Sequence, residues 1–404
     1  MIVRYRYRDF VTDDIRNITH NNSLDIDYDY VTGEFLPFQA FFTGRTMFKG
    51  VTIEPSIKFP DEQERFSDDA FFPCVEEYLN DVGFDASMPF MGAVSGGVDS
   101  SVLALHMMPK TIYSGYYEVD GYSEIEYSSS IAKEIGAEHI KYKLTEHDFL
   151  DNAVEYIHLT GTPAAGMGGV MEYVILKKAV KDTDINQVVF GNGGDEVFLG
   201  YFFNYYVKEF LENGDAEPAY MPNFLLSKKR IANELIDFMI VASLNRGGAG
   251  SLHSAFSLEL VRKISRISPF LHKLLHININ VTMPTLLHIN NQICKAVGVC
   301  GINPLANRHL IKKAVSINTP MSTLPKERLR MACGNMPDGI KNNYTKKGFP
   351  MPVDRWPLLR DVLEDAYNSF SKRPQFSNVK PFNGVDRFAW SVFQAETILR
   401  EVLK

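Results

Sequence analysis

Cysteine is scarce in this sequence, with four residues in 404, and no two of them form a CxxC pair. This argues against a cysteine-based zinc site and favours a reducing, cytoplasmic setting over a disulfide framework. No apolar run reaches the length of about 18 residues that a membrane span needs, and no apolar segment follows the first residues as in a signal peptide. Repeats and low-complexity tracts are also lacking. We therefore expect a cytoplasmic globular protein without a membrane partner.

Positive charge is in short supply as well, because 42 Lys and Arg residues face 49 Asp and Glu residues, for a net charge of -7. Such a balance argues against a broad surface for nucleic acid or anionic membranes. Hydrophobic residues make up 45% of the chain, enough to bury substantial cores. The length predicts roughly two to three domains.

Two regions differ in their sequence pattern. Residues 1–67 read as a short β-rich region, because apolar and polar residues partly alternate at 2–7 and 24–30. Residues 68–404 begin with a helical pattern at 69–82 and then alternate between strand and helix patterns. This alternation predicts an α/β fold, with a doubly wound, mostly parallel sheet. Strands are expected at 90–94, 111–117, 139–144 and 187–190, and helices at 123–135, 147–159 and 170–180.

The sequence after about residue 205 predicts a helical C-terminal extension. Helical spacing occurs at 225–243, 258–276, 285–297 and 389–403. Loop-like stretches separate these segments, including residues 302–304. We expect the helices to pack on the α/β unit.

The first chemical motif follows the apolar run at 90–94. Two glycines turn the chain there, and hydroxyl side chains then lead into an apolar helix. Glycine lets the backbone approach a ligand, and the N-terminus of a helix favours an anion. A carboxylate at this place suits a bound metal ion between it and a phosphate. A simple strand-to-helix turn is the alternative. The candidate phosphate-binding residues are Ser95, Gly96, Gly97, Val98, Asp99, Ser100 and Ser101.

A second glycine-rich turn ends the strand expected at 187–190 and contains Gly191, Asn192, Gly193 and Asp195. Since neighbouring parallel strands end at one edge of a sheet, Asp99 and Asp195 could hold Mg²⁺ against a triphosphate. The alternative is that Asp195 and Glu196 cap a helix.

Together with residues 346–352, these two motifs resemble the three signature segments of the asparagine synthetase C-terminal domain, an N-type ATP pyrophosphatase. The resemblance covers roughly residues 68–360 and implies a PP-loop fold of the adenine nucleotide α-hydrolase type. It implies that residues 95–101 cradle the pyrophosphate of ATP, that Gly191 and Gly193 belong to the cofactor-binding residues, and that Gly115 borders the adenine.

The resemblance also implies residue roles in catalysis. Asp99 and Asp195 would ligate Mg²⁺, and Lys346 stands where the family has its catalytic lysine, with Lys347 as a possible substitute. Fixed positive charge there would stabilise attack on the α-phosphorus. Either lysine could instead be a solvated surface charge.

The sequence departs from this family at two places near the expected site. Asn192 replaces a glutamate that handles a proton, and an amide cannot act as a base; lactam-forming relatives have tyrosine there. Cys300, Ile302 and Asn307 replace a Glu, an Arg and an Asp, which leaves the acceptor carboxylate open between aspartate and another molecule. For Cys300 a buried thiol is the more common role, with a nucleophile as the alternative. His106 and His139 are expected to be structural.

We expect the family's glutaminase half to be absent or vestigial here, because Ile2 follows Met1 and residues 1–67 are too short for it. Ammonia would come from solution or from a separate glutaminase partner, or another amine would react.

We therefore predict a ligase that adenylates a carboxylate, releases AMP and diphosphate, and forms an amide, with asparagine as the default product. Lactam or specialised-metabolite amidation and a non-catalytic nucleotide-binding relative are the alternatives. A tRNA-modifying ATP pyrophosphatase fits less well, since the chain is acidic.

Overall fold

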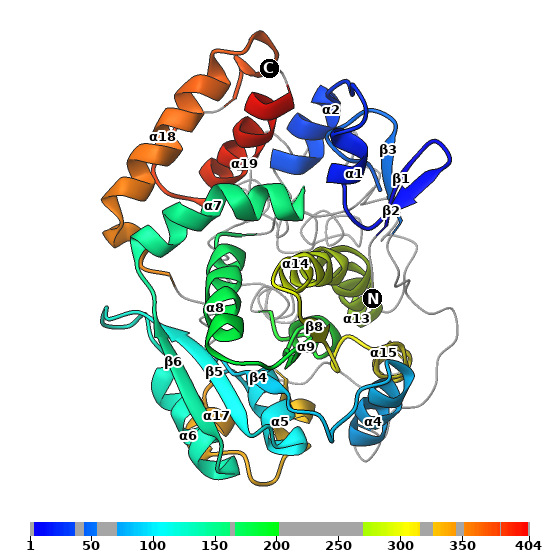
Figure 1. Ribbon diagram of the computed structural model, residues 1–404, viewed down its shortest axis with the longest axis vertical. Coiled ribbons are helices and arrows are strands. Elements are labelled where there is room, and N and C mark those ends of the chain that lie inside the picture. Colours follow the sequence, from blue (N-terminus) through cyan, green and yellow to red (C-terminus); the bar gives the residue numbers. More distant parts are fainter. Residues whose placement is uncertain are drawn as a thin grey trace, which may run out of the picture.

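The computed structural model describes residues 4–36, 44–54, 71–161, 166–201, 270–315, 326–344, 351–379 and 381–402. A five-stranded parallel sheet forms the centre of the fold, with strand order β6-β5-β4-β7-β8 (Figure 1). Its strands are β4 (Met91–Ala93), β5 (Thr111–Tyr116), β6 (Glu138–Lys143), β7 (Gln187–Val189) and β8 (Cys300–Ile302). The order reverses direction between β4 and β7. In open parallel sheets this switch point is where ligands bind.

Helices cover both faces of the sheet. Figure 1 shows α5 (Val98–Met107) and α6 (Ile125–Ile135) on one side and α8 (Gly168–Asp182) on the other. Because side chains alternate along a strand, Ile112 of β5 joins the core with α5 and α6, whereas Tyr113 joins the core with α8. The sheet therefore separates two hydrophobic cores.

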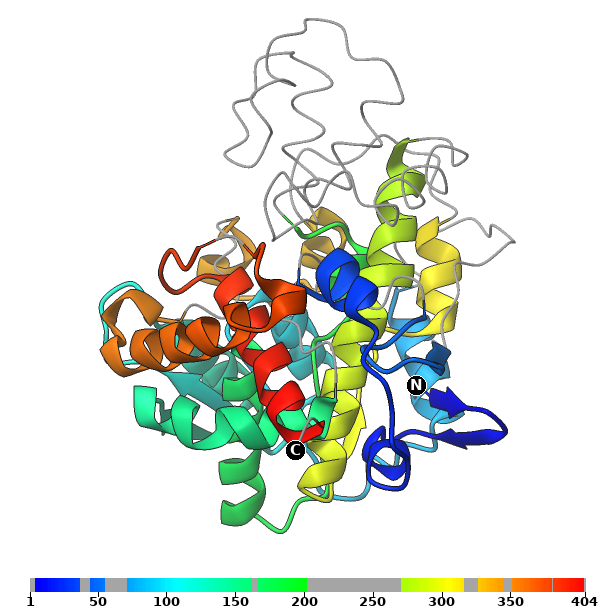
Figure 2. The same ribbon diagram turned by 90° about the horizontal axis from the view of Figure 1, so that it is seen from above.

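The remaining helices extend these two cores. A long rod, drawn in yellow-green, runs through the middle of the molecule from α13 (Phe270–Ile277) through a π-helical turn to α14 (Met283–Ala296) (Figure 2). The other helices of the part of the chain described after the N-terminal region are α4 (Phe71–Asp81), α7 (Glu146–Thr160), α9 (Gly194–Val197), α15 (Arg308–Val315), α16 (Glu327–Met331), α17 (Asp338–Lys341), α18 (Pro357–Ser371) and α19 (Arg387–Val402).

The N-terminal region forms a three-stranded antiparallel sheet, β2-β1-β3, from β1 (Arg4–Tyr7), β2 (Phe10–Thr12) and β3 (Val51–Glu54). Short helices α1 (Arg16–Thr19) and α2 (Tyr28–Tyr30) accompany it. The strand predicted at 24–30 is wrong. Asp27 accepts a hydrogen bond from the Tyr30 backbone N–H, so it caps α2 and turns the chain into a helix.

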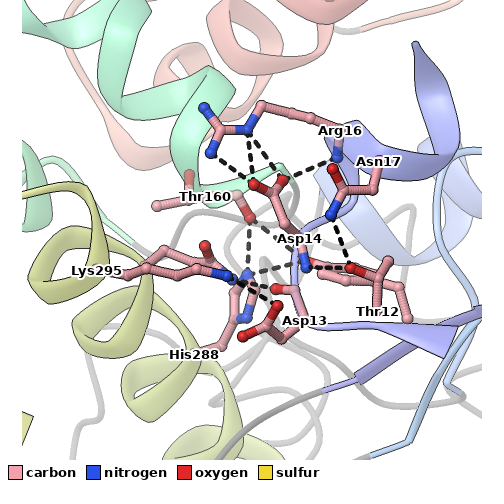
Figure 3. Close-up of polar contacts among 10 residues, drawn as sticks. Thr12, Asp13, Asp14, Arg16, Asn17, Thr160, His288 and Lys295 are labelled. Carbon is pink, nitrogen blue, oxygen red and sulfur yellow. Dashed lines mark hydrogen bonds and ion pairs between the residues drawn. The ribbon is translucent and has the colours of Figure 1, made fainter. Parts of the chain in front are cut away.

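This N-terminal region packs against α7 and α14 through polar contacts as well as through a shared core (Figure 3). The Lys295 ammonium lies 2.8 Å from a carboxylate oxygen of Asp13. The Nε2 atom of His288 lies 2.8 Å from the Thr160 carbonyl oxygen and 2.8 Å from the Tyr5 hydroxyl. Burial lowers the pKa of His288 to about 4, so its ring is neutral in this contact.

The structure confirms the α/β fold and the helices and strands predicted between 69 and 190. It adds an edge strand, β8, to a stretch whose end we expected to be a loop. The helix predicted at 225–243 and most of the one at 258–276 lie outside the described residues. None of the described helices combines the length and hydrophobicity that crossing a membrane requires.

Candidate functional site

The first glycine-rich turn joins β4 to α5 and is held by its own hydroxyl groups. The Ser95 backbone N–H donates to the Ser100 hydroxyl oxygen over 3.2 Å, and the Gly97 N–H donates to the Ser95 hydroxyl oxygen over 3.2 Å. Gly96 has φ +91°, and a Cβ there would lie 2.8 Å from the Cβ of Tyr127. The turn therefore requires glycine at this position. It also brings the N-terminus of α5 to a cavity that both glycine-rich turns line.

The second turn joins β7 to α9 and touches the first. A Cβ on Gly191 would lie 2.8 Å from the Ser100 backbone nitrogen, and a Cβ on Gly194 would lie 2.3 Å from the Asp99 carboxyl carbon. Gly193 has φ +100° and packs against Ala306. The small glycines thus allow two strand-end turns to approach each other, which places Asp99 close to Asp195.

Lys326, which the sequence analysis did not select, lies between these two carboxylates. Its ammonium contacts a carboxylate oxygen of Asp99 and lies 2.8 Å from Oδ1 of Asp195. Burial alone would lower the pKa of Lys326, but the two carboxylates raise it above its usual value. The lysine therefore stays charged, and the two carboxylates together contact its ammonium group.

The two turns form one wall of a cavity of about 420 Å³. Of the predicted site residues in the described part of the chain, Ser101 does not line this cavity and is buried. The others do line it: Ser95, Gly96, Gly97, Val98, Asp99, Ser100, Gly115, Gly191, Asn192, Gly193 and Asp195. A pocket of this size at the sheet's switch point is large enough for a small ligand.

The third sequence segment lies only partly in view, because Lys346 and Lys347 fall outside the described residues. The chain before it is held by Arg330, which also lines the cavity. Its guanidinium donates three hydrogen bonds of 2.7 Å, to the carbonyl oxygens of Ile340, Lys341 and Asn343.

A row of side-chain amides connects Asn192 to a carboxylate on α8. The Asn192 amide donates to Asn303 over 3.0 Å, Asn303 donates to Asn290 over 2.9 Å, and Asn290 donates to Glu172 over 3.1 Å. Glu172 lines the same cavity as Asn192, and its burial raises its pKa. We call Asn192, Asn303 and Asn290 the amide row, which ends at the carboxylate of Glu172.

The other carboxylate of the second motif, Glu196, is buried and accepts a hydrogen bond from the Tyr201 hydroxyl. Glu196 is also one of the residues that line the cavity.

The residues that differ from the family near position 300 do not line the cavity in the described structure. Cys300 is exposed on the edge strand β8, so the expectation of a buried thiol is wrong. Ile302 is buried in the core, and Asn307 accepts the Leu310 backbone N–H at the start of α15. Asn303 of this segment reaches the site through its hydrogen bond with Asn192.

The two histidines expected to be structural also lie outside the cavity lining. His106 lies 2.6 Å from a carboxylate oxygen of Glu76, and His139 lies 2.9 Å from the Ser114 hydroxyl. Burial lowers the pKa of His139 to about 4.

The functional candidates that the sequence analysis missed are Glu172, Asn290, Asn303, Lys326 and Arg330. Each reaches the cavity or its amide row through tertiary packing, which adjacent residues in the sequence do not reveal. The signal that could have suggested Lys326 is the need of two adjacent buried carboxylates for a nearby cation.

Comparison with known proteins places the chain among related sequences. The family model described as asparagine synthase matches residues 85–389. Asparagine synthetase (glutamine-hydrolyzing) 1 of Bacillus subtilis (strain 168) is 25% identical over 164 residues, which are 39% of this chain and 24% of the relative. A candidate glutamine-hydrolyzing asparagine synthetase of Mycobacterium tuberculosis (strain H37Rv) is 31% identical over 112 residues, 27% of this chain and 17% of the relative.

The match thus spans about a quarter or less of the length of each of these relatives. The family match, in contrast, covers most of the chain, including both glycine-rich turns and the amide row. This protein belongs to the asparagine synthase family.

Proposed function

We propose that this protein is an ATP-dependent ligase that activates a carboxylate as its acyl-adenylate and then forms an amide. The observation that supports this most directly is the contact between the two glycine-rich turns at the switch point of the sheet. They bring a helix N-terminus, loop N–H groups and two carboxylates to one cavity. N–H groups at a helix N-terminus bind phosphate, and family membership favours ATP as its source.

The paired carboxylates suit Mg²⁺ as the metal that would accompany ATP. Asp99 and Asp195 already converge on the cation of Lys326, so their geometry favours positive charge. Groups of three or more metal-binding side chains are not found within the described ranges. Magnesium at nucleotide sites needs no more than one or two carboxylates, since phosphate oxygens and water complete its shell. When bound, Mg²⁺ would neutralise charge on the pyrophosphate.

Adenylation brings a carboxylate against a phosphate, so the site must supply positive charge. Lys326 is fully enclosed and remains protonated, because Asp99 and Asp195 hold its ammonium in place. We propose that ATP and Mg²⁺ take over part of this contact, which would leave Lys326 to stabilise the departing pyrophosphate. Lys346 is proposed to act on the α-phosphate side.

The acceptor and the nitrogen donor are proposed from the names of the relatives and from the chain itself. Aspartate is the default acceptor, since the relatives are named asparagine synthetases. We propose that ammonia or another amine reacts, taken from solution or from a separate glutaminase chain. A lactam or specialised-metabolite amide is the alternative product, because Asn192 replaces the family's glutamate.

Product analysis of ATP tests the proposal. The protein is incubated with ATP, Mg²⁺, ammonium chloride and a panel of carboxylates, aspartate first. Release of AMP and pyrophosphate that depends on one carboxylate would support adenylation and identify the acceptor. The Asp99→Ala variant should lose this activity. ATP binding without pyrophosphate release for any carboxylate would instead favour a non-catalytic nucleotide-binding protein.

A further inference from the structure

Five carboxylates line the cavity, namely Asp99, Glu124, Glu172, Asp195 and Glu196, and Glu172 has surroundings that suit proton transfer. Asp99 and Asp195 share the ammonium of Lys326, which favours their charged form and makes them weak bases. Glu196 accepts the Tyr201 hydroxyl. Glu172 instead projects from α8 into the cavity and accepts a hydrogen bond from the neutral amide of Asn290.

The groups that face Glu172 come from three neighbouring elements. Tyr113 lies on β5, Tyr156 on α7, and Asn290 and Cys294 on α14. Burial raises the pKa of Tyr113, Tyr156 and Cys294 most, and the charge of Glu172 raises all three further. For Tyr113 the charge of Cys294 contributes more than that of Glu172. All three groups therefore stay neutral. No cationic side chain among the described residues contributes to the pKa of Glu172. Its carboxylate is therefore a stronger base than one in water.

The amide row sets the position of this carboxylate relative to the second glycine-rich turn. An ionised carboxylate can only accept, so Asn290 must turn its N–H₂ toward Glu172 and its oxygen toward Asn303. Asn303 in turn accepts a hydrogen bond from the N–H₂ of Asn192, so the three hydrogen bonds of the row all run in one direction. The side-chain oxygen of Asn192 can still act as an acceptor. Asn192 can orient an N–H group of a nucleophile, but it cannot take its proton.

We propose that Glu172 accepts the proton that the incoming amine loses when it attacks the acyl-adenylate, and that the amide row positions Glu172 for this step. This inference rests on the proposed function. The nitrogen lone pair forms the new C–N bond, the carbon–oxygen bond to AMP breaks, and AMP leaves with that electron pair. The proton from nitrogen passes to the Glu172 carboxylate and then to solvent. Adenylation itself releases no N–H proton and does not need Glu172.

The test compares the two half-reactions in Glu172→Gln, in which the side-chain oxygen can still accept the Asn290 hydrogen bond. The matched control is Glu134→Gln, which removes an exposed carboxylate from α6. With ATP, Mg²⁺ and the active carboxylate of the panel, carboxylate-dependent exchange of labelled pyrophosphate into ATP measures adenylation. Amide formation from ammonium chloride measures the second step.

We expect exchange in Glu172→Gln to stay within about threefold of wild type while amide formation falls at least about 100-fold, the range typical of a lost general base. Hydroxylamine, whose protonated adduct is more acidic than that of ammonia and loses its proton to water more readily, should restore product formation as the hydroxamate. Glu172→Asp should recover part of the ammonia-dependent rate. Once the rates are divided by the fraction of ammonium present as free ammonia at each pH, the acid limb of the profile for amide formation should disappear in Glu172→Gln and remain in Glu134→Gln.

Two outcomes would overturn the role of Glu172 alone. One is equal amide formation in wild type and Glu172→Gln, and the other is an equal loss of exchange and of hydroxamate, which would indicate a role in substrate binding or packing. If wild type catalyses no exchange with any carboxylate, the proposed function fails, and the role of Glu172 fails with it.

Discussion

Three of the five carboxylates that line the cavity form two groups with opposite electrostatic surroundings. Asp99 and Asp195 meet a buried ammonium, whereas Glu172 meets neutral amide, phenol and thiol groups. A paired carboxylate keeps its charge and binds cations, but an isolated buried one is held closer to protonation. One cavity can therefore combine a site for a metal-bound polyphosphate with a separate site for proton transfer.

The two groups also differ in how they are built. The charged group depends on glycines, because backbone from two turns must approach within van der Waals distance. The neutral group depends on asparagines, whose amides donate at one end and accept at the other. Substitutions that affect one group and spare the other can therefore test whether the division is real.

The largest effect is expected for Lys326→Met. Without the ammonium, two buried carboxylates face each other, so we expect unfolding free energy to fall by about 3 kcal/mol. Pyrophosphate release should fall at least about 100-fold. Added Mg²⁺ should stabilise this variant more than wild type, because the cation position is open. Chemical denaturation with and without Mg²⁺ measures both effects. Equal Mg²⁺ stabilisation of the two proteins would argue against a shared cation position.

Sequence analysis could find the two carboxylates of the charged group but neither Lys326 nor the neutral group, and the reason is physical. The turns at 95–101 and 191–195 are local, since glycine, hydroxyl and carboxylate residues needed for them are adjacent in the chain. Lys326 and Asp99 are 227 residues apart in the sequence, and Asn303 and Asn192 are 111 residues apart, so no local sequence pattern predicts either contact. Similarly, residues 24–30 alternate like a strand, but the side chain of Asp27 caps a helix instead.

A smaller effect is expected for Gly194→Ala, which affects the charged group through the backbone. A Cβ there would lie 2.4 Å from Oδ1 of Asp99, so the carboxylate must move away from Lys326 and Asp195. We expect pyrophosphate release to fall by about 10- to 100-fold, because small displacements of binding groups are costly. Gly334→Ala is the control, since a Cβ there meets no atom within 4 Å. Similar rates for both variants would show that the contact between the turns is not needed.

Asn303→Ala is expected to have a smaller effect and to act on the neutral group. It removes the acceptor of Asn192 and the donor of Asn290, which should cost about 1–3 kcal/mol of stability. If the amide row positions Glu172, amide formation should fall by about tenfold while pyrophosphate exchange stays near wild type. The ratio of the two rates is the measurement. A parallel fall in both rates would indicate that Asn303 supports the whole cavity rather than one half of it.

The smallest effect separates the two groups by the sign of a stability change. Burial raises the pKa of Glu172 in the folded protein above its value in the unfolded chain. The folded state therefore binds more protons between these two pKa values, so unfolding free energy falls as pH rises through that window and stays lower above it. Glu172→Gln removes this cost and should be more stable than wild type at pH 7.5, with the difference shrinking as the pH falls toward the ordinary range of glutamate. Denaturant titrations at pH 7.5 and 5, with Glu134→Gln as the control, measure this. A stability difference that does not depend on pH would show that Glu172 is not held near protonation, in contrast to the loss of stability expected for Lys326→Met.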